Sequence, residues 1–227
     1  LTITTGARYD DHSLFGTAVS PKVAVVERLT DWLTARASYG RGFRAPDVGQ
    51  LYYRFLNPTN LYQVIGNPHL EPERSNSWQV GVESRSGSRA RVGLNLFHND
   101  VTNLIQAVNL GMMTSSAQLA AVAAANDITP DFNVQLNRLL FLYENVARAR
   151  TRGVELSGNY RIGQVARVSG TYAYVDAIDA NTGAALSNRN SHQGTVRVDW
   201  TPIRYGIRAN LRGAFYSSWI AGSTRSV

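Results

Sequence analysis

The stretch WLTARASYGRG, residues 32–42, alternates apolar and polar side chains and decides the fold class. Leu33, Ala35, Ala37 and Tyr39 fall on one face, as the period of two in a β-strand requires. The stretch has about the 9–11 residues that a tilted strand needs to cross a bilayer. Similar alternation predicts about nine strands in all, the others being LTITTGARY, SPKVAVVER, SWQVGVES, ARVGLNLFHN, RGVELSGNYRI, ARVSGTYAYVD, GTVRVDW and YGIRANLRGAFY.

The predicted connections between these strands alternate in length. Short ones fall at 29–31, 85–88, 163–164 and 201–204, and long ones at about 10–20, 43–74, 105–142 and 178–191. Short turns at one rim and long loops at the other are typical of an up-and-down outer-membrane β-barrel. A soluble β-sandwich has no reason to separate its loops in this way.

Aromatic residues on the apolar face support a membrane location. They gather in two girdles, where amphipathic rings prefer the lipid interface. Near the short turns lie Trp32, Tyr160, Trp200 and Tyr205, and near the long loops lie Tyr39, Trp78, Tyr172 and Tyr174. The alternative, that strands simply favour aromatic residues, stays open.

The polar face carries many arginines, which a dry interior would not accept. Burying each of these charges costs several kcal/mol, so a hydrated lumen inside a wide barrel is expected. The predicted inward set is Arg36, Arg91, Arg161, Arg167, Arg197, Arg208 and Arg212. Because lipid cannot satisfy open strand edges, about nine strands form part of a larger barrel. The fold class is all-β, an antiparallel up-and-down transmembrane β-barrel.

Composition argues against several functional classes. The net charge is +7, but Lys22 is the single lysine among 23 basic residues, and scattered arginines make a poor phosphate-binding stripe. A bias in the base composition of the genome would explain the preference for arginine over lysine equally well. Cysteine is absent, and the histidines lack metal-ligand spacing: His12, His69, His98 and His192. We therefore expect no nucleic-acid partner, no metal site, no cofactor and no enzymatic activity.

The first long loop begins at a proline corner. Pro46 fixes its own φ, lacks an amide donor and pushes Ala45 into an extended conformation, so strand pairing stops there. Pro68 and Pro72 act similarly at the return, and the acidic pair Glu71 and Glu73 can bind Arg41, Arg44 or Arg74. The predicted loop-anchor motif is Phe43, Arg44, Ala45, Pro46, Asn67, Pro68, Leu70, Pro72 and Glu73. A structural role for it is favoured over ligand contact.

Between the anchors lies DVGQLYYRFLNPTNLYQVIG, residues 47–66. Tyr52, Tyr53, Arg54 and Tyr62 are polar aromatic and cationic groups that suit an anionic or metal-chelated ligand. Exposed loops on a rigid scaffold often carry function. These four are the predicted ligand-binding residues, although packing between loops is the alternative for each ring. In the next long loop, SSAQLAAVAAAND predicts a short helix capped by Ser115 or Ser116, with Pro130 beyond it.

The corner and the blocks that follow it resemble the TonB-dependent outer-membrane receptors. YGRGFRAPDVGQLY and GNPHLEPERSNSWQVGVE are followed in order by NLFHNDVTNLI, YENVARARTRGVELSGNYRI, YAYVDAIDANTG and NRNSHQGTVRVDW. The resemblance implies that residues 1–227 are part of one barrel domain of about 22 strands, without its plug domain and final strand. It places the protein in the outer membrane of a Gram-negative cell, in contact with outer-membrane lipid.

The resemblance also implies a function. It is active import of a scarce metal chelate, a ferric siderophore before others, driven by the TonB energy-coupling protein through an N-terminal region. The alternatives are a passive porin or surface adhesin, a cobalamin or haem receptor of the same family, and a soluble all-β binding module. Haem is disfavoured because no histidine lies between the two motifs, His69 falling inside the second.

Overall fold

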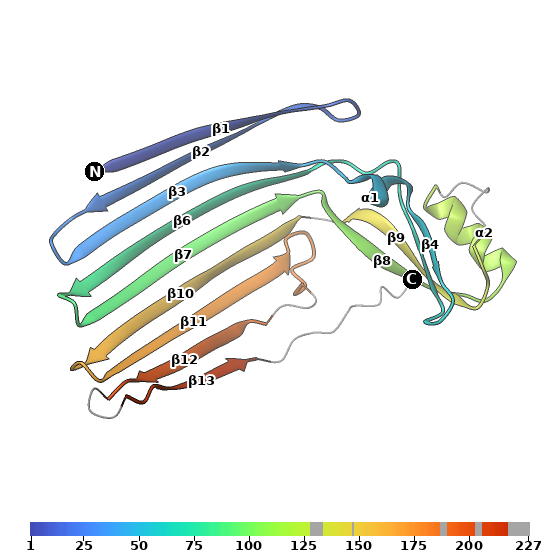
Figure 1. Ribbon diagram of the computed structural model, residues 1–227. Coiled ribbons are helices and arrows are strands. Elements are labelled where there is room, and N and C mark those ends of the chain that lie inside the picture. Colours follow the sequence, from blue (N-terminus) through green and yellow to red (C-terminus); the bar gives the residue numbers. More distant parts are fainter. Residues whose placement is uncertain (128–133, 147, 187–189, 203–205, 218–227) are drawn as a thin grey trace.

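The computed structural model describes residues 1–127, 134–146, 148–186, 190–202 and 206–217. These residues form two β-sheets and two short helices (Figure 1). Neither helix in the described ranges is long and apolar enough to cross a membrane.

The larger sheet has nine strands in the order β1-β2-β3-β6-β7-β10-β11-β12-β13, and every neighbouring pair is antiparallel. The sheet remains open, with β1 and β13 at its edges (Figure 1). This confirms the predicted antiparallel meander of about nine strands. The strands are β1 (Thr2–His12), β2 (Gly16–Arg28), β3 (Leu33–Arg44), β6 (Glu73–Ser86), β7 (Ala90–Thr102), β10 (Ala149–Ile162), β11 (Ala166–Asp179), β12 (His192–Trp200) and β13 (Ala209–Tyr216).

The predicted alternation of short and long connections holds except at the first one. A long loop at about 10–20 is wrong, because β1 extends to His12 and β2 begins at Gly16. Gly16 has a φ of +69°, which a glycine adopts without steric cost. The Leu14 N–H also donates to Nδ1 of His12 over 3.2 Å, so the connection closes as a tight turn.

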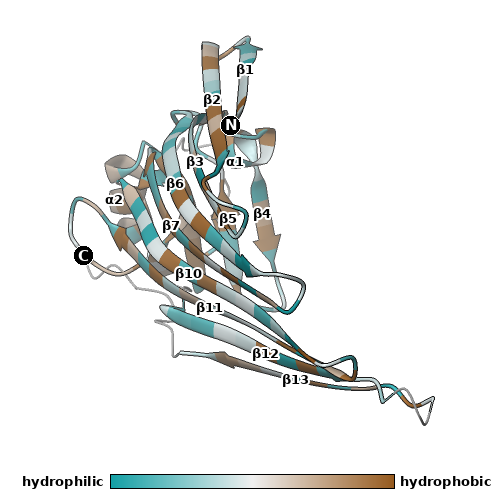
Figure 2. Ribbon diagram, turned by 90° about the vertical axis from the view of Figure 1, so that its left-hand side faces the viewer, coloured by the Kyte–Doolittle hydropathy of each residue, from teal (hydrophilic) through white to brown (hydrophobic). Residues whose placement is uncertain are grey.

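The two faces of the large sheet differ in polarity. Val82, Leu94 and Leu156 lie side by side on one face and are exposed, whereas Arg36 and Asn95 lie in the adjacent row on the other. Brown and teal residues accordingly alternate along the strands in Figure 2. We call the two surfaces the apolar face and the polar face. Exposed apolar side chains on a sheet are the arrangement that a lipid-facing barrel wall requires.

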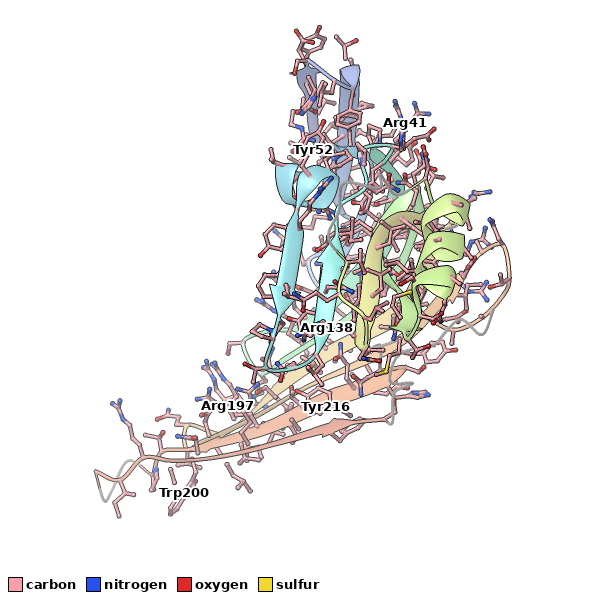
Figure 3. The ribbon with its side chains drawn as sticks, turned by 90° about the vertical axis from the view of Figure 1, so that its right-hand side faces the viewer. Arg41, Tyr52, Arg138, Arg197, Trp200 and Tyr216 are labelled. Atoms are coloured by element: carbon pink, nitrogen blue, oxygen red, sulfur yellow. The ribbon has the colours of Figure 1, made fainter. Side chains whose placement is uncertain are left out.

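The aromatic side chains of the predicted girdles that belong to strands lie on the apolar face, whereas Trp32 precedes β3 (Leu33–Arg44) in a turn. Figure 3 shows Trp200 on one side of the sheet and Arg197 on the other. The exposed members include Trp32, Tyr39, Trp78, Tyr160, Tyr172, Tyr174 and Trp200. Tyr205 lies outside the described residues.

The smaller sheet, which we call the loop sheet, was missed by the sequence analysis. It has the order β4-β5-β9-β8 and is built from the two long segments that were expected to be loops. The elements of these segments are α1 (Val48–Tyr52), β4 (Arg54–Asn57), β5 (Tyr62–Ile65), β8 (Leu104–Met113), α2 (Ser116–Ala125) and β9 (Arg138–Val146). β5 pairs in parallel with β9, so the two loops share one sheet.

Buried contacts join the two loops inside the loop sheet. The Gln63 side chain is almost fully buried; its Nε2 donates to the Gln135 carbonyl over 2.9 Å, and its Oε1 accepts from the Gln135 N–H over 3.0 Å. A core cluster of four residues lies in the same sheet: Ile65, Met113, Leu140 and Leu142. The loops therefore form one packed unit rather than two independent arms.

Helix α2 covers one face of the loop sheet. Its Leu119 and Val122 pack against the core cluster, and its first turn is capped by Ser115, whose Oγ accepts from the Gln118 N–H over 3.2 Å. The predicted short helix is therefore confirmed, with Ser115 rather than Ser116 as its cap. Pro130 lies outside the described residues.

Candidate ligand-binding site at the loop sheet

The corner after β3 turns directly into a capped helical turn. β3 ends at Arg44, two residues before the buried Pro46. Asp47 Oδ1 then accepts from the Gln50 N–H over 2.7 Å, and Gln50 Oε1 accepts from the Asp47 N–H over 3.1 Å. Such a reciprocal capping box satisfies two amide donors at the start of α1. The chain therefore leaves the barrel sheet in a defined direction.

Glu73 fixes the base of both loops. This carboxylate is only 9% exposed, and it accepts from Arg44 Nη1 over 2.9 Å and from the Ile105 N–H over 2.8 Å. Arg44 also donates through Nη2 to Gln50 Oε1 over 3.3 Å. One side chain thus joins the end of β3 to the start of β8. The expected pairing of Glu73 with Arg44 is present.

Asp47 Oδ2 lies 4.0 Å from Arg44 Nη2, but the other predicted partners, Glu71, Arg41 and Arg74, do not join this ion pair. Glu71 Oε2 instead accepts from Asn103 Nδ2 over 2.7 Å. Arg41 donates through Nε to the Tyr39 hydroxyl over 3.2 Å. Arg74 lies 5.7 Å above the Phe43 ring, in a cation–π contact.

The return segment packs under α1. The Asn67 N–H donates to the Gln50 carbonyl over 2.8 Å, and Asn67 Oδ1 accepts from the His69 N–H over 2.9 Å. Leu70 is buried in a cluster with Leu51 and Ile105. These contacts are consistent with the anchoring role proposed for the motif, which also includes Pro68 and Pro72.

Gly66 allows the end of β5 to approach α1. Its N–H donates to the Tyr53 carbonyl over 2.7 Å, and a Cβ added at this position would lie 2.6 Å from the Tyr52 amide nitrogen. Backbone atoms line the contact, so no flexible side chain can move aside. Glycine is therefore the residue type that fits at position 66 without a shift of the backbone.

We expect Gly66→Ala to destabilise the packing of α1 against β5 by about 1–3 kcal/mol, because the added methyl group overlaps backbone. Hydrogen exchange of the α1 and β5 amides in the full-length receptor measures this. Gly6→Ala is the matched control, since a Cβ there meets nothing within 4 Å. Equal exchange in both variants would contradict the close approach.

Four aromatic rings form a continuous row across the loop sheet, which we call the aromatic ladder. Tyr53 and Phe55 stack with ring centroids 5.7 Å apart, Phe55 and Tyr62 are 5.9 Å apart, and Tyr62 meets Phe141 edge-on at 6.0 Å. Offset and edge-on pairs at such distances are favourable. The rings come from the residue after α1 and from β4, β5 and β9.

The aromatic ladder lies on the face that α2 leaves uncovered. Residues alternate across a strand, so Tyr62 and Phe141 lie opposite Ile65 and Leu140, which pack against α2. Figures 1 and 3 show α2 on the side of the loop sheet away from the nine-stranded sheet. The ladder therefore faces the end of the large sheet.

The structure brings together only two of the four predicted ligand-binding residues. Tyr53 and Tyr62 belong to the ladder, whereas Tyr52 is an exposed residue of α1 and Arg54 alternates to the face opposite Phe55. Sequence reasoning missed Phe55 and Phe141. The spacing of Tyr53 and Phe55 indicated one shared strand face, but the position of Phe141 depends on the parallel pairing of β5 with β9.

A hollow of about 540 Å³ lies on the polar face at the end of the large sheet nearest the loop sheet. Small residues leave room there, and Phe97 and Lys22 contribute an apolar and a cationic group. The small lining residues are Ser38, Gly40, Gly42, Ser75 and Ser77. Small-molecule sites commonly have volumes of about 300–1,000 Å³. The ladder and this upper hollow together make the candidate site.

Comparison with known families identifies the class of this barrel sheet. The family described as TonB dependent receptor-like, beta-barrel, matches residues 1–226. The chain therefore belongs to the TonB-dependent receptor β-barrel family. Members of that family are receptors and transporters rather than an enzyme class.

Solved structures share the same architecture. The ferric enterobactin receptor PfeA from Pseudomonas aeruginosa, in complex with enterobactin, superimposes with a TM-score of 0.70 at 22% identity, covering 96% of this chain and 30% of that one. The siderophore receptor PirA from Acinetobacter baumannii gives 0.70 at 22% identity, with coverages of 98% and 32%. The copper transporter OprC gives 0.60 at 17% identity, with coverages of 82% and 24%.

These likenesses show the fold alone, since each identity is below 25%. The chain spans about a third or less of the length of these three proteins. The substrate and partners of the whole protein accordingly remain matters for a proposal.

Proposed function

We propose that this chain forms part of the barrel of an outer-membrane receptor that imports a scarce metal chelate, a ferric siderophore first among them. In this proposal residues 1–227 belong to one barrel domain, and TonB drives the import. The apolar face contacts outer-membrane lipid, and the polar face lines the lumen.

One observation supports the receptor function above the others: the aromatic ladder lies on the face of the loop sheet away from α2, and α2 lies on the side away from the large sheet. Ring faces suit the flat aryl groups and delocalised charge of many metal chelates. The upper hollow offers hydroxyl, amide and ammonium groups, including Ser77, Asn99 and Lys22. A chelate entering from the loop side would meet the rings first and the polar wall next.

The relatives support the same proposal. PfeA is described as a ferric enterobactin receptor and PirA as a siderophore receptor. OprC is described as a copper transporter. A passive pore would not need such a row of aromatic side chains in its loops. Cobalamin and haem remain the alternative cargoes for the same scaffold.

Ligand titration of the full-length receptor tests the proposal, with ferric enterobactin as the first probe. We expect the double variant Tyr53→Ala/Tyr62→Ala to bind at least about tenfold more weakly, a loss of about 1.4 kcal/mol. The reason is that both ends of the Phe55 contact are removed from the ladder. Tryptophan fluorescence quenching gives the dissociation constants.

Tyr52→Ala is the matched control, because Tyr52 has the same side chain and a similar exposure but lies outside the ladder. Its affinity should stay within about twofold of the unchanged receptor. Surface abundance of each variant is measured beside the titration. An unchanged affinity in the double variant, at normal abundance, would assign the ladder to loop packing alone.

A further inference from the structure

Three pairs of arginines face each other directly across hairpins of the large sheet. The cross-strand partners are Arg85 with Arg91, Arg161 with Arg167, and Arg197 with Arg212. The first two pairs lie next to short turns, whereas Arg197 and Arg212 lie near the middle of β12 (His192–Trp200) and β13 (Ala209–Tyr216). Like charges directly opposite each other destabilise a sheet. Three such arginine pairs on one sheet therefore require nearby negative charge to offset their repulsion.

The carboxylates near these arginine pairs neutralise only part of their positive charge. Glu83 lies 2.6 Å from Arg85 Nε and 3.5 Å from Arg91 Nε, and Asp199 Oδ1 lies 2.6 Å from Arg197 Nη2. Within the described residues, no carboxylate lies within ion-pair distance of Arg161, Arg167 or Arg212. Six guanidinium groups thus share two carboxylates, which leaves four positive charges.

Three of these arginines border a hollow of about 260 Å³ on the polar face. Arg91 lies at one side, and Arg197 and Arg212 lie at the other; we call this site the arginine hollow. Its floor consists of small residues, chiefly hydroxyl-bearing ones: Ser157, Ser169, Thr171, Thr195, Gly158 and Gly170. The Thr171 and Thr195 hydroxyls are 2.7 Å apart, so one of them donates to the other.

This combination of groups recognises oxoanions. The planar guanidinium fork matches a carboxylate or phosphate, and hydroxyl groups supply further donors. The volume is below that of most drug-sized sites, so it suits one anionic group rather than a whole chelate. The arginine hollow shares no lining residue with the upper hollow, and a third hollow of about 390 Å³ between them shares Ser157, Thr171 and Thr195 with the arginine hollow.

We propose that the arginine hollow is an anion-binding site that takes a carboxylate or phosphate group on the lumen wall. The group comes either from a solute in the lumen or from an acidic side chain elsewhere in the receptor. Bound there, it relieves the repulsion between Arg197 and Arg212. The proposal needs a hydrated polar face, but it does not depend on which chelate the receptor carries.

The proposal predicts whether Arg212→Gln lowers or raises the stability of the receptor. Arg212→Gln removes a charge without breaking any ion pair of the described residues. If an anion is bound, the variant loses a partner, and the Tm of the full-length receptor falls by about 2 °C or more. If Arg197 and Arg212 only repel each other, the variant is as stable as the unchanged receptor or more so. Arg89→Gln, on the turn between β6 and β7, is the control for general charge loss.

Inorganic phosphate distinguishes the two sources of the anion, with chloride at equal ionic strength as the reference. Stabilisation of the unchanged receptor by phosphate, lost in Arg212→Gln, supports a solute site. A less stable Arg212→Gln receptor with no phosphate effect supports an internal acidic side chain. Equal phosphate stabilisation of both forms, or a Tm of Arg212→Gln that does not fall when phosphate has no effect, would overturn the proposal.

Discussion

Leu94→Arg is expected to destabilise the membrane-embedded receptor by about 2–4 kcal/mol, the cost of placing a cation at mid-bilayer depth on a barrel's lipid face. Leu94 lies midway along β7, between Val82 and Leu156 on neighbouring strands, and is 39% exposed. All three side chains belong to the apolar face. Chemical unfolding of the full-length receptor in lipid vesicles measures the change.

The control for this variant is Gln79→Arg, on the polar face of the neighbouring strand β6. Gln79 is exposed and borders the upper hollow, so a new arginine there remains in water and should cost less than about 1 kcal/mol. If the Gln79 variant were the less stable of the two, the apolar face would not be the one that meets lipid.

Glu73→Ala should open the base of the loop sheet at a cost of about 1–4 kcal/mol. The change leaves the buried Ile105 N–H without its acceptor, which costs about 1–3 kcal/mol. It also removes the ion pair with the half-exposed Arg44, worth at most about 1 kcal/mol. Hydrogen exchange of the β8 and α1 amides measures this local opening.

Glu71→Ala is the comparison for that experiment. Glu71 is two residues away and exposed, and its carboxylate accepts a hydrogen bond from Asn103. Its removal should cost less than about 1 kcal/mol, since the Asn103 side-chain amide can donate to water instead. Similar exchange rates in the two variants would show that Glu73 does not hold the loops together.

The large sheet was predictable because its strands obey one simple rule. Alternation in WLTARASYGRG and its counterparts places apolar side chains on one face, and sequential hairpins pair neighbours along the chain. The predicted long connection at about 10–20 is wrong because Asp10, Asp11 and His12, although polar, continue β1. They are part of β1, and the turn depends on the φ of Gly16.

The loop sheet could not be predicted in the same way. β5 pairs with β9 in parallel, although more than 70 residues separate Tyr62 from Leu139. The alternation of residues within β5 carries no information about which distant strand pairs with it. The ladder was therefore only half found, through Tyr53 and Tyr62, while Phe141 reaches it by tertiary pairing. Tyr52 and Arg54 resemble the ladder residues in chemistry but not in the face they occupy.

The central claim is energy-coupled uptake of a metal chelate, and transport of radioactive iron into whole cells tests it most directly. Cells lacking the gene are supplied with the full-length receptor, in otherwise identical strains with and without functional TonB, and given ferric enterobactin and then other ferric chelates. The proposal predicts saturable uptake of at least one chelate that requires both the receptor and TonB. Uptake that rises linearly with chelate concentration and is equal in the two strains would contradict it and indicate a passive pore.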